Sequence, residues 1–254
     1  MRSTPVDEMI RSLPLKQMDA TLLSRELLLA SEAAGNDVDL VEKAIAYASY
    51  LHRDQTRANR GDMPRVHYIE HPLRSALRLV RWGVTDQAAI IASILHDTVE
   101  DCVDDIVALS PVTKTSDPRH TALTFWATEF GTTVYRTVEA VTNPELPAGL
   151  TRAQKHDAYR THVVEAIADP RVALVKFTDF VDNALSLHHT ASHSANKDMV
   201  ARLASKYEPL GDAFIARLFQ PDVEAFVPFR GMQEITETLA SGLARLRTQA
   251  AKTA

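Results

Sequence analysis

The chain has 254 residues, 45% of them hydrophobic, which suits one large domain or two small ones with a sizeable core. Its 28 Lys and Arg residues against 33 Asp and Glu residues give a net charge of −5, which argues against a nucleic-acid-coating surface. The single cysteine, Cys102, excludes an intramolecular disulfide framework and suits a reducing cytosol. The N-terminal stretch MRSTPVDEMIRSLP lacks the apolar core of a signal peptide, and the longest apolar run is too short to span a membrane. We therefore expect a cytoplasmic protein with neither nucleic-acid nor membrane partners. An oligomer is possible, but the sequence does not predict one.

Helical periodicity recurs along the chain, and only 8 residues are glycine. Strand-like alternation does not persist beyond four residues. The pattern predicts helices over residues 22–34, 39–54, 72–82, 86–104, 121–129, 132–141, 152–168, 171–188, 196–219 and 231–250. Polar stretches predict loops over 56–66 and 110–120. We therefore predict an all-α, single-domain helical fold.

The stretch LHDTVEDC, residues 95–102, ends an apolar run with a cluster of charge. Its ionisable side chains are those of His96, Asp97, Glu100 and Asp101. On one continuous helix these four span an arc of about 140°, so they could converge on one site. A divalent cation would compensate such a cluster, because imidazole and carboxylate are its usual ligands; the alternative is a solvent-exposed acidic helix end. A second His-Asp pair, His156–Asp157, lies in a polar helix, and we interpret it as a solvated surface pair.

A metal ion at this cluster would need ligands from other segments. His71 begins a predicted apolar helix and could point inward, with His67 as its local rival. Asp179 lies in the middle of the apolar segment VALVKFTDFVDNALSL, where an unpaired carboxylate would be costly. Its neighbours at helical spacing are Lys176, Asp182, Asn183 and Ser186. This polar stripe is either a buried hydrogen-bond network or the wall of a ligand site.

The order of these motifs resembles the HD phosphohydrolase superfamily. His71, the pair His96–Asp97 and Asp179 resemble its metal-binding signature. The words YIEHPL, ILHDTVED, FGTTVYRTVEAVT, VALVKFTDFVDNALSL and YEPLGDAFIARL follow the order found in the hydrolase domain of RelA/SpoT-type alarmone enzymes. The resemblance covers roughly residues 40–220. It implies an HD hydrolase domain over residues 36–220, an N-terminal helical extension over 1–35 and a C-terminal helical arm over 221–254.

The resemblance also implies roles for single residues. One divalent metal ion, Mn²⁺ in this family, would be held by His71, His96, Asp97 and Asp179. Glu100 and Asp101 would form the catalytic acid pair, and which of them is the base stays open because close carboxylates titrate together. The implied substrate-binding residues are Arg57, which would pack against guanine, Asn183 and Ser186, which would contact sugar and phosphates, and Lys176, which would support the site.

The implied activity is that of a stand-alone small alarmone hydrolase, which removes the 3′-pyrophosphate from the small-molecule nucleotide (p)ppGpp. The stretch between Arg57 and His71 is longer than is usual in the family and carries Arg60 and Arg65. It motivates an alternative, the same chemistry on another phosphorylated purine such as (p)ppApp or NADPH. A non-catalytic module that senses an alarmone is a further alternative, against which the intact Glu100–Asp101 pair argues.

Overall fold

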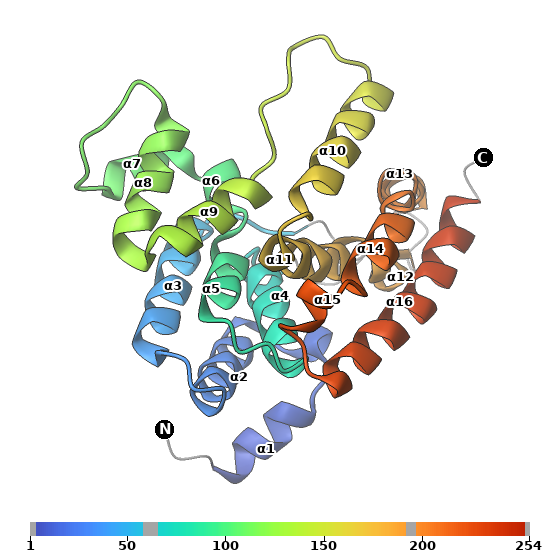
Figure 1. The fold of residues 1–254 in the computed structure, drawn as a ribbon, viewed down its shortest axis with the longest axis horizontal. Coiled ribbons are helices and arrows are strands. Elements are labelled where there is room, and N and C mark those ends of the chain that lie inside the picture. The colour runs from blue at the N-terminus through green and yellow to red at the C-terminus, as the bar shows by residue number, and fades with distance from the viewer. Residues whose placement is uncertain (1–3, 58–65, 192–196, 252–254) are drawn as a thin grey trace.

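The protein, seen in a computed structural model, is described over residues 4–57, 66–191 and 197–251. Within these ranges the chain is helical and contains no strand, and its β pairing is limited to an isolated antiparallel bridge between Thr56 and His67. The all-α prediction is confirmed (Figure 1). None of the described helices is both long enough and apolar enough to cross a bilayer.

The helices follow one another with short connections. The first half contains α1 (Pro5–Ser12), the 3₁₀ turn η1 (Leu15–Gln17), α2 (Ala20–Ala33), α3 (Val38–Leu51), α4 (Glu70–Arg81), α5 (Gln87–Leu95), α6 (Thr98–Asp101), α7 (Val103–Leu109) and α8 (Pro118–Phe130). The second half contains α9 (Thr132–Val141), α10 (Arg152–Ala166), α11 (Pro170–Phe180), the π-helical turn η2 (Val181–Leu185), α12 (His188–Ala191), α13 (Lys197–Tyr207), α14 (Leu210–Leu218), α15 (Pro221–Glu224) and α16 (Phe229–Ala250). The elements α1, η1 and α15 were not predicted, because segments this short display little helical periodicity.

Three predicted helices are divided in the structure. The predicted helix 86–104 becomes α5, α6 and α7, because the chain leaves the helix at His96–Asp97 and again at Cys102. The predicted helix 196–219 becomes α13 and α14 on either side of Pro209, whose ring cannot continue a helix. The predicted helix 171–188 becomes α11, η2 and the start of α12. Two of these divisions fall in segments that contain predicted site residues.

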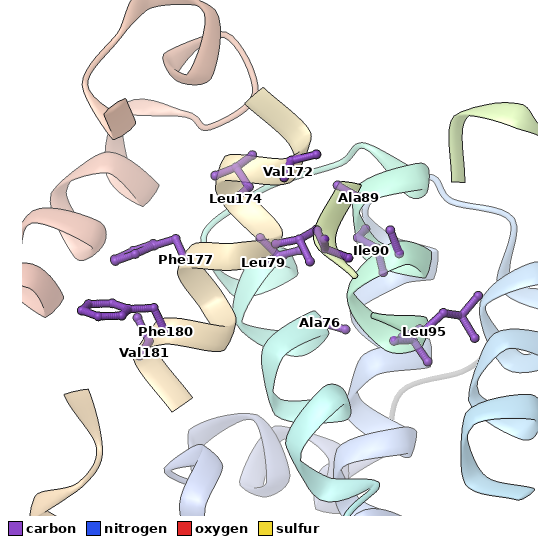
Figure 2. Close-up of a cluster of buried hydrophobic side chains, with 14 of the residues drawn as sticks. Ala76, Leu79, Ala89, Ile90, Leu95, Val172, Leu174, Phe177, Phe180 and Val181 are labelled. Carbon is purple, nitrogen blue, oxygen red and sulfur yellow. The ribbon is translucent and has the colours of Figure 1, made fainter. Parts of the chain in front are cut away.

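Helix α4 lies at the centre of the molecule and packs against α2, α5 and α11 (Figure 1). Figure 2 shows Leu79 of α4 and Ile90 of α5 in the space between α4, α5 and α11, whereas Phe177 points to the opposite side of α11. There its ring contacts those of Trp82 and Phe214. Leu79, Ile90 and Phe177 have no exposed surface. Burying a side chain of this size contributes about 1.5–3 kcal/mol, so such contacts hold α11 against α4 and α5 on one side and against α14 on the other.

Both ends of the chain share this core. Ile10 of α1 and Leu246 of α16 belong to the same cluster of buried apolar residues. Helix α16 lies close against η2 because Gly242 has no side chain: a Cβ there would lie 2.7 Å from the Cδ1 atom of Leu185. The two terminal segments therefore pack on the helices that carry the polar residues described next.

Candidate metal centre

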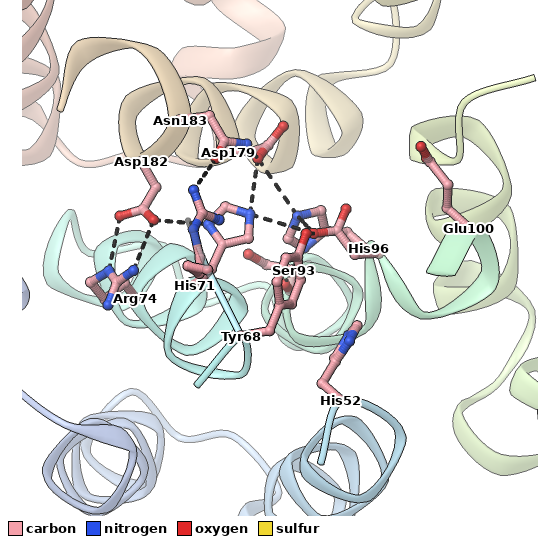
Figure 3. A network of polar contacts seen from close by, with 12 residues as sticks. His52, Tyr68, His71, Arg74, Ser93, His96, Glu100, Asp179, Asp182 and Asn183 are labelled. Atoms are coloured by element: carbon pink, nitrogen blue, oxygen red, sulfur yellow. Dashed lines mark hydrogen bonds and ion pairs between the residues drawn. The ribbon is translucent and has the colours of Figure 1, made fainter. Parts of the chain in front are cut away.

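Four side chains from three packed helices meet at one point of the fold. His71 is the second residue of α4, His96 and Asp97 form the turn after α5, and Asp179 is the penultimate residue of α11. The ligand atoms of His71, His96 and Asp97 all lie within 4.8 Å of one another. The Oδ1 atom of Asp179 lies 3.1 Å from His71 Nε2 and 3.7 Å from His96 Nε2 (Figure 3). The structure therefore brings together the four residues that the resemblance names as metal ligands.

The turn at His96–Asp97 corrects the expectation of a continuous helix. His96 Nδ1 donates to the backbone carbonyl of Ser93 at 2.8 Å, and Thr98 Oγ1 donates to that of Leu95 at 2.6 Å. Side-chain donors that bond to backbone carbonyl groups compete with the backbone N–H groups of the helix, and α5 ends here. The prediction that positions 96, 97, 100 and 101 lie on one continuous helix, within an arc of about 140°, is wrong for this reason.

Each imidazole presents a bare nitrogen to the centre. His96 Nδ1 must carry its proton because its partner is a carbonyl, and His71 Nδ1 must carry one because its partner is the carboxylate of Asp182, at 2.9 Å. Both Nε2 atoms are buried and find no hydrogen-bond partner among the described residues. In a neutral imidazole such a nitrogen is a lone pair facing carboxylate oxygens, so this arrangement requires a cation or a second proton.

The charges of the centre give the same result. Burial lowers the pKa of His96, but the facing carboxylates of Asp97 and Asp179 outweigh it and raise that pKa well above its usual value. Burial raises the pKa of Asp179, but its contacts with His71 and His96 outweigh it and hold that pKa well below its usual range. A site that holds two carboxylates ionised and favours positive charge on two imidazoles fits a divalent cation. The donor set, two imidazoles and two carboxylates, is typical of transition-metal sites.

Asp182 supports the centre from behind His71. Asp182 is 2% exposed, and its carboxylate accepts a hydrogen bond from His71 Nδ1. The same carboxylate receives Arg74 Nε and Nη2 at 3.0 and 3.1 Å and Lys16 Nζ at 2.9 Å, and it lies 3.5 Å from Arg78 Nη2. The π-helical turn η2 directs Asp182 toward these cations while Asp179, in the last turn of α11, faces the imidazoles. Such a partner fixes the tautomer and orientation of a histidine ligand.

The predicted acid pair lies beside the centre. Glu100 is exposed, and its carboxylate accepts hydrogen bonds from the backbone N–H and the Nδ2 amide of Asn143 at 2.9–3.1 Å. Figure 3 shows Glu100 set apart from the hydrogen-bonded network of the histidines. Asp101 is also an exposed residue. Partial desolvation of its carboxyl group and the charges of Asp97 and Glu100 nevertheless raise its pKa to about 6. The catalytic roles of both residues stay predictions.

A cavity of about 350 Å³ contains most of the predicted substrate-binding residues. Arg57, Asn183 and Ser186 line it, together with Lys16 and Tyr207. Arg57 Nη2 donates to Asn183 Oδ1, and Asn183 Nδ2 donates to Asp179 Oδ1, so the cavity is linked to the metal centre by hydrogen bonds. The volume is within the range of small-molecule sites.

Other predicted residues are placed differently. Lys176 is buried in α11 one turn before Asp179, burial lowers its pKa, and it is not among the described residues that line this cavity. His67 is exposed, which leaves His71 as the inward histidine of that segment. Arg60 and Arg65 lie outside the described residues.

A second, more open cleft of about 460 Å³ lies on the other side of Glu100. Its wall contains the basic residues Arg152, Lys155, His156 and Lys206 besides Glu100. The interpretation of His156–Asp157 as a surface pair is correct for Asp157, which is exposed and paired with Arg160. It is incomplete for His156, which is half-buried in the cleft.

Three further residues that were not predicted as site residues, Tyr68, Lys16 and Asp182, contact the centre or its supporting network. Tyr68 Oη donates to Asp97 Oδ2 at 2.7 Å, and Lys16 reaches Asp182 from the N-terminal segment. A signal for Asp182 was present in the middle of α4. Arg74 and Arg78 recur there one turn apart, and two buried guanidinium groups require a buried carboxylate on a neighbouring helix.

The fold and this centre define a class of protein. The HD domain family matches residues 44–213, more than half of the chain, and the chain belongs to that family. Membership implies dependence on a divalent metal ion, in agreement with the buried group formed by His71, His96 and Asp97.

Individual relatives of the chain have more specific names than the family. The chain is 31% identical over 147 residues to a guanosine-3′,5′-bis(diphosphate) 3′-pyrophosphohydrolase of Aquifex aeolicus, covering 58% of this chain and 18% of the relative. It is 29% identical over 184 residues to a GTP pyrophosphokinase of Myxococcus xanthus, covering 69% of this chain and 21% of the relative. The chain thus spans about a fifth of the length of these two proteins. It is also 29% identical over 155 residues to a guanosine-3′,5′-bis(diphosphate) 3′-pyrophosphohydrolase of Mus musculus, covering 61% of this chain and 73% of the relative.

Proposed function

We propose that this protein is a metal-dependent 3′-pyrophosphohydrolase of (p)ppGpp that releases pyrophosphate from the alarmone. The main support for this proposal is that the buried Nε2 atoms of His71 and His96 have no hydrogen-bond partner and face the carboxylates of Asp97 and Asp179. The names of the Aquifex and mouse relatives supply the substrate. The mouse relative matters most for the comparison, because the aligned region covers 73% of its length.

The proposed metal ion is Mn²⁺, held by His71, His96, Asp97 and Asp179. Imidazole and carboxylate ligands together suit a transition metal of intermediate softness. When bound, the ion would supply Lewis-acid catalysis by polarising a phosphoryl oxygen and acidifying a water molecule. A cytoplasmic location is part of the proposal and is supported by the single, buried cysteine.

The proposed hydrolysis transfers the 3′-diphosphate to water. The water oxygen forms a bond to the phosphorus atom that is attached to the 3′-oxygen, and the bond between that phosphorus and the 3′-oxygen breaks. Glu100 or Asp101 accepts the water proton, and a proton is delivered to the departing 3′-oxygen, which leaves pyrophosphate and guanosine 5′-diphosphate, or 5′-triphosphate when the substrate is pppGpp. The hydrogen bonds from Asn143 hold Glu100 in one orientation for this work.

The proposed nucleotide site is the cavity lined by Arg57, Asn183 and Ser186. The flat guanidinium of Arg57 suits stacking on a purine, and it is held by Asn183. Ser186 Oγ donates to the backbone carbonyl of Asp182, which leaves its lone pairs facing the cavity and its hydroxyl free to rearrange toward sugar or phosphate. Lys176 is proposed to support the site from α11 through its charge.

The test is a product assay with a panel of nucleotides. The purified protein is incubated with Mn²⁺ and ppGpp, ppApp or NADPH, and the products are separated by ion-exchange chromatography. Pyrophosphate and GDP released from ppGpp are the expected result. Turnover of an adenine nucleotide alone would overturn the guanine substrate, and tight ppGpp binding without turnover or bound metal would identify a sensor.

A further inference from the structure

The nucleotide cavity contains a cation that comes from outside the HD domain. Lys16 lies in η1, ahead of the family's matched residues 44–213, and it lines the same cavity wall as Arg57 and Ser186. Its side chain is 15% exposed, so the ammonium group lies at the cavity surface.

The ammonium group of Lys16 is held in place and still has a donor available. It lies 2.9 Å from Asp182 Oδ1 and donates to the Asp182 backbone carbonyl at 3.5 Å. An ammonium group carries three donors, so these two contacts leave one. A cation fixed on two sides and open on the third is placed to receive a ligand oxygen.

Asp182 does not need Lys16 as a counter-ion. Arg74 binds both of its carboxylate oxygens, His71 donates to Oδ2, and Arg78 lies 3.5 Å from Oδ1. A carboxylate has about four lone-pair sites, and these donors nearly fill them without the lysine. Lys16 is thus surplus to the neutralisation of Asp182.

The surroundings of the cavity carry more positive than negative charge. The cations are Lys16, Arg57, Arg74 and Arg78, and the carboxylates that face them are Asp182 and Glu70. Asp97 and Asp179 face the imidazoles of the metal centre instead. Burial lowers the pKa of Lys16 to about 7, and the charges of Arg74 and Arg57 lower it further against the opposing effect of Asp182. Lys16 and Arg57 line the cavity itself, while Arg74 and Arg78 contact Asp182, so the excess of positive charge is complementary to an anionic ligand.

We propose that Lys16 binds a phosphate group of the nucleotide, so that the segment before the HD domain completes the substrate cavity. The inference rests on the proposed nucleotide substrate and assigns it a further specificity-determining residue. Charge-assisted hydrogen bonds from lysine to phosphate are among the strong contacts of nucleotide sites.

The test measures nucleotide binding by the 254-residue chain without turnover. Affinity for ppGpp is determined by calorimetry in EDTA for the wild type, K16M, K16Q and K16R, with K43M as the matched control. Lys43 forms an ion pair with Glu129 away from the cavity. We expect K16M and K16Q to bind at least tenfold more weakly, which is about 1.4 kcal/mol, with a shallower salt dependence. K16R and K43M are expected to stay within threefold of the wild type.

A merely structural role for Lys16 predicts a different pattern. If the lysine only supports Asp182, K16M would lose Mn²⁺ affinity through His71 while its ppGpp affinity in EDTA would be unchanged, and that result overturns the inference. Unchanged ppGpp affinity in K16Q, which retains a donor toward Asp182, would overturn it as well if K16M does not fold.

The outcome also separates this inference from the proposed hydrolase function. Lysine-dependent ppGpp binding without pyrophosphate release in Mn²⁺ would leave the inference standing and remove the function. Normal ppGpp hydrolysis with the same KM in the wild type and K16M would support the hydrolase function and overturn the role of Lys16.

Discussion

His71 Nδ1 lies 2.9 Å from Asp182 Oδ2, while Nε2 of the same ring lies 3.1 Å from Asp179 Oδ1. One imidazole therefore connects a carboxylate of the proposed metal centre with a carboxylate that is buried among cations. The proton on Nδ1 is fixed by Asp182, which makes Nε2 the atom that faces the centre. The proposed role of His71 as a metal ligand consequently depends on Asp182, which is not itself a proposed ligand.

D182N is expected to weaken Mn²⁺ binding by about 10- to 100-fold, the usual effect of removing the carboxylate behind a histidine ligand. The amide can still accept the Nδ1 proton, but it no longer raises the basicity of the ring. Calorimetric titration of the metal-free protein measures the effect. D105N is the matched control, because Asp105 pairs with Arg53 at the surface. A folded D182N protein with wild-type Mn²⁺ affinity would contradict this role.

The helical fold and three residues of the candidate metal centre, His96, Asp97 and Asp179, could be singled out from the sequence, whereas His71 had His67 as a rival until the family resemblance selected it. A carboxylate in an apolar helix, such as Asp179, must be compensated, and His96–Asp97 follow an apolar run in the same way. The local backbone was not predictable. The turn after Leu95 depends on the side chains of His96 and Thr98 taking backbone carbonyls, and helical periodicity does not record that competition.

The partners of Asp182 show a second limit. Asp182 was visible as a polar neighbour of Asp179, but its cationic partners lie in other segments, and one of them, Lys16, is 166 residues away in the chain. Helical periodicity is a local property, so it cannot predict a contact between two segments so distant in sequence. Only the close packing of α4 against α11 and of the N-terminal segment against η2 reveals which charges meet.

D179A is expected to abolish both Mn²⁺ binding and turnover. Removal of this carboxylate leaves the two Nε2 atoms with Asp97 as their single carboxylate of the centre. Metal content after dialysis and pyrophosphate release report the two effects separately. D157N serves as the control, since Asp157 is 62% exposed and lies outside the centre. Wild-type hydrolysis by D179A would remove Asp179 from the ligand set.

E100Q is expected to retain Mn²⁺ and to lose kcat by about 10²- to 10⁴-fold, the range of general acid–base catalysis. Glutamine preserves the shape of the side chain and its acceptor toward Asn143, but it cannot take a proton. N143A is expected to lower kcat less, because the carboxylate remains and only its orientation is released. Steady-state kinetics with Mn²⁺ content measured in parallel decide the case. An unchanged kcat in E100Q would assign the base to Asp101 alone or to another group.

Metal removal is expected to lower thermal stability reversibly. A ligand that binds only the folded state at 100 times its Kd stabilises that state by about 2.7 kcal/mol. For a chain of this size that corresponds to a shift in Tm of about 5–10 °C. Scanning calorimetry with EDTA and with Mn²⁺ measures it, and H96A, which removes one proposed ligand, is expected to show a much smaller difference. An equal shift in H96A would locate the stabilising metal elsewhere.

Asp101 is expected to make stability depend on pH in the metal-free protein. Its pKa is about 6 in the folded state and near the ordinary 3.8 in the unfolded chain, so between these values the folded state binds more protons. The free energy of unfolding therefore falls as pH rises through this window, and above it the ionised carboxylate destabilises the fold. D101N removes that cost: its Tm is expected to exceed the wild-type value at pH 7.5 and to match it near pH 4. Scans in EDTA at the two pH values test this, and a variant less stable than the wild type at pH 7.5 would show that Asp101 contributes favourable contacts instead.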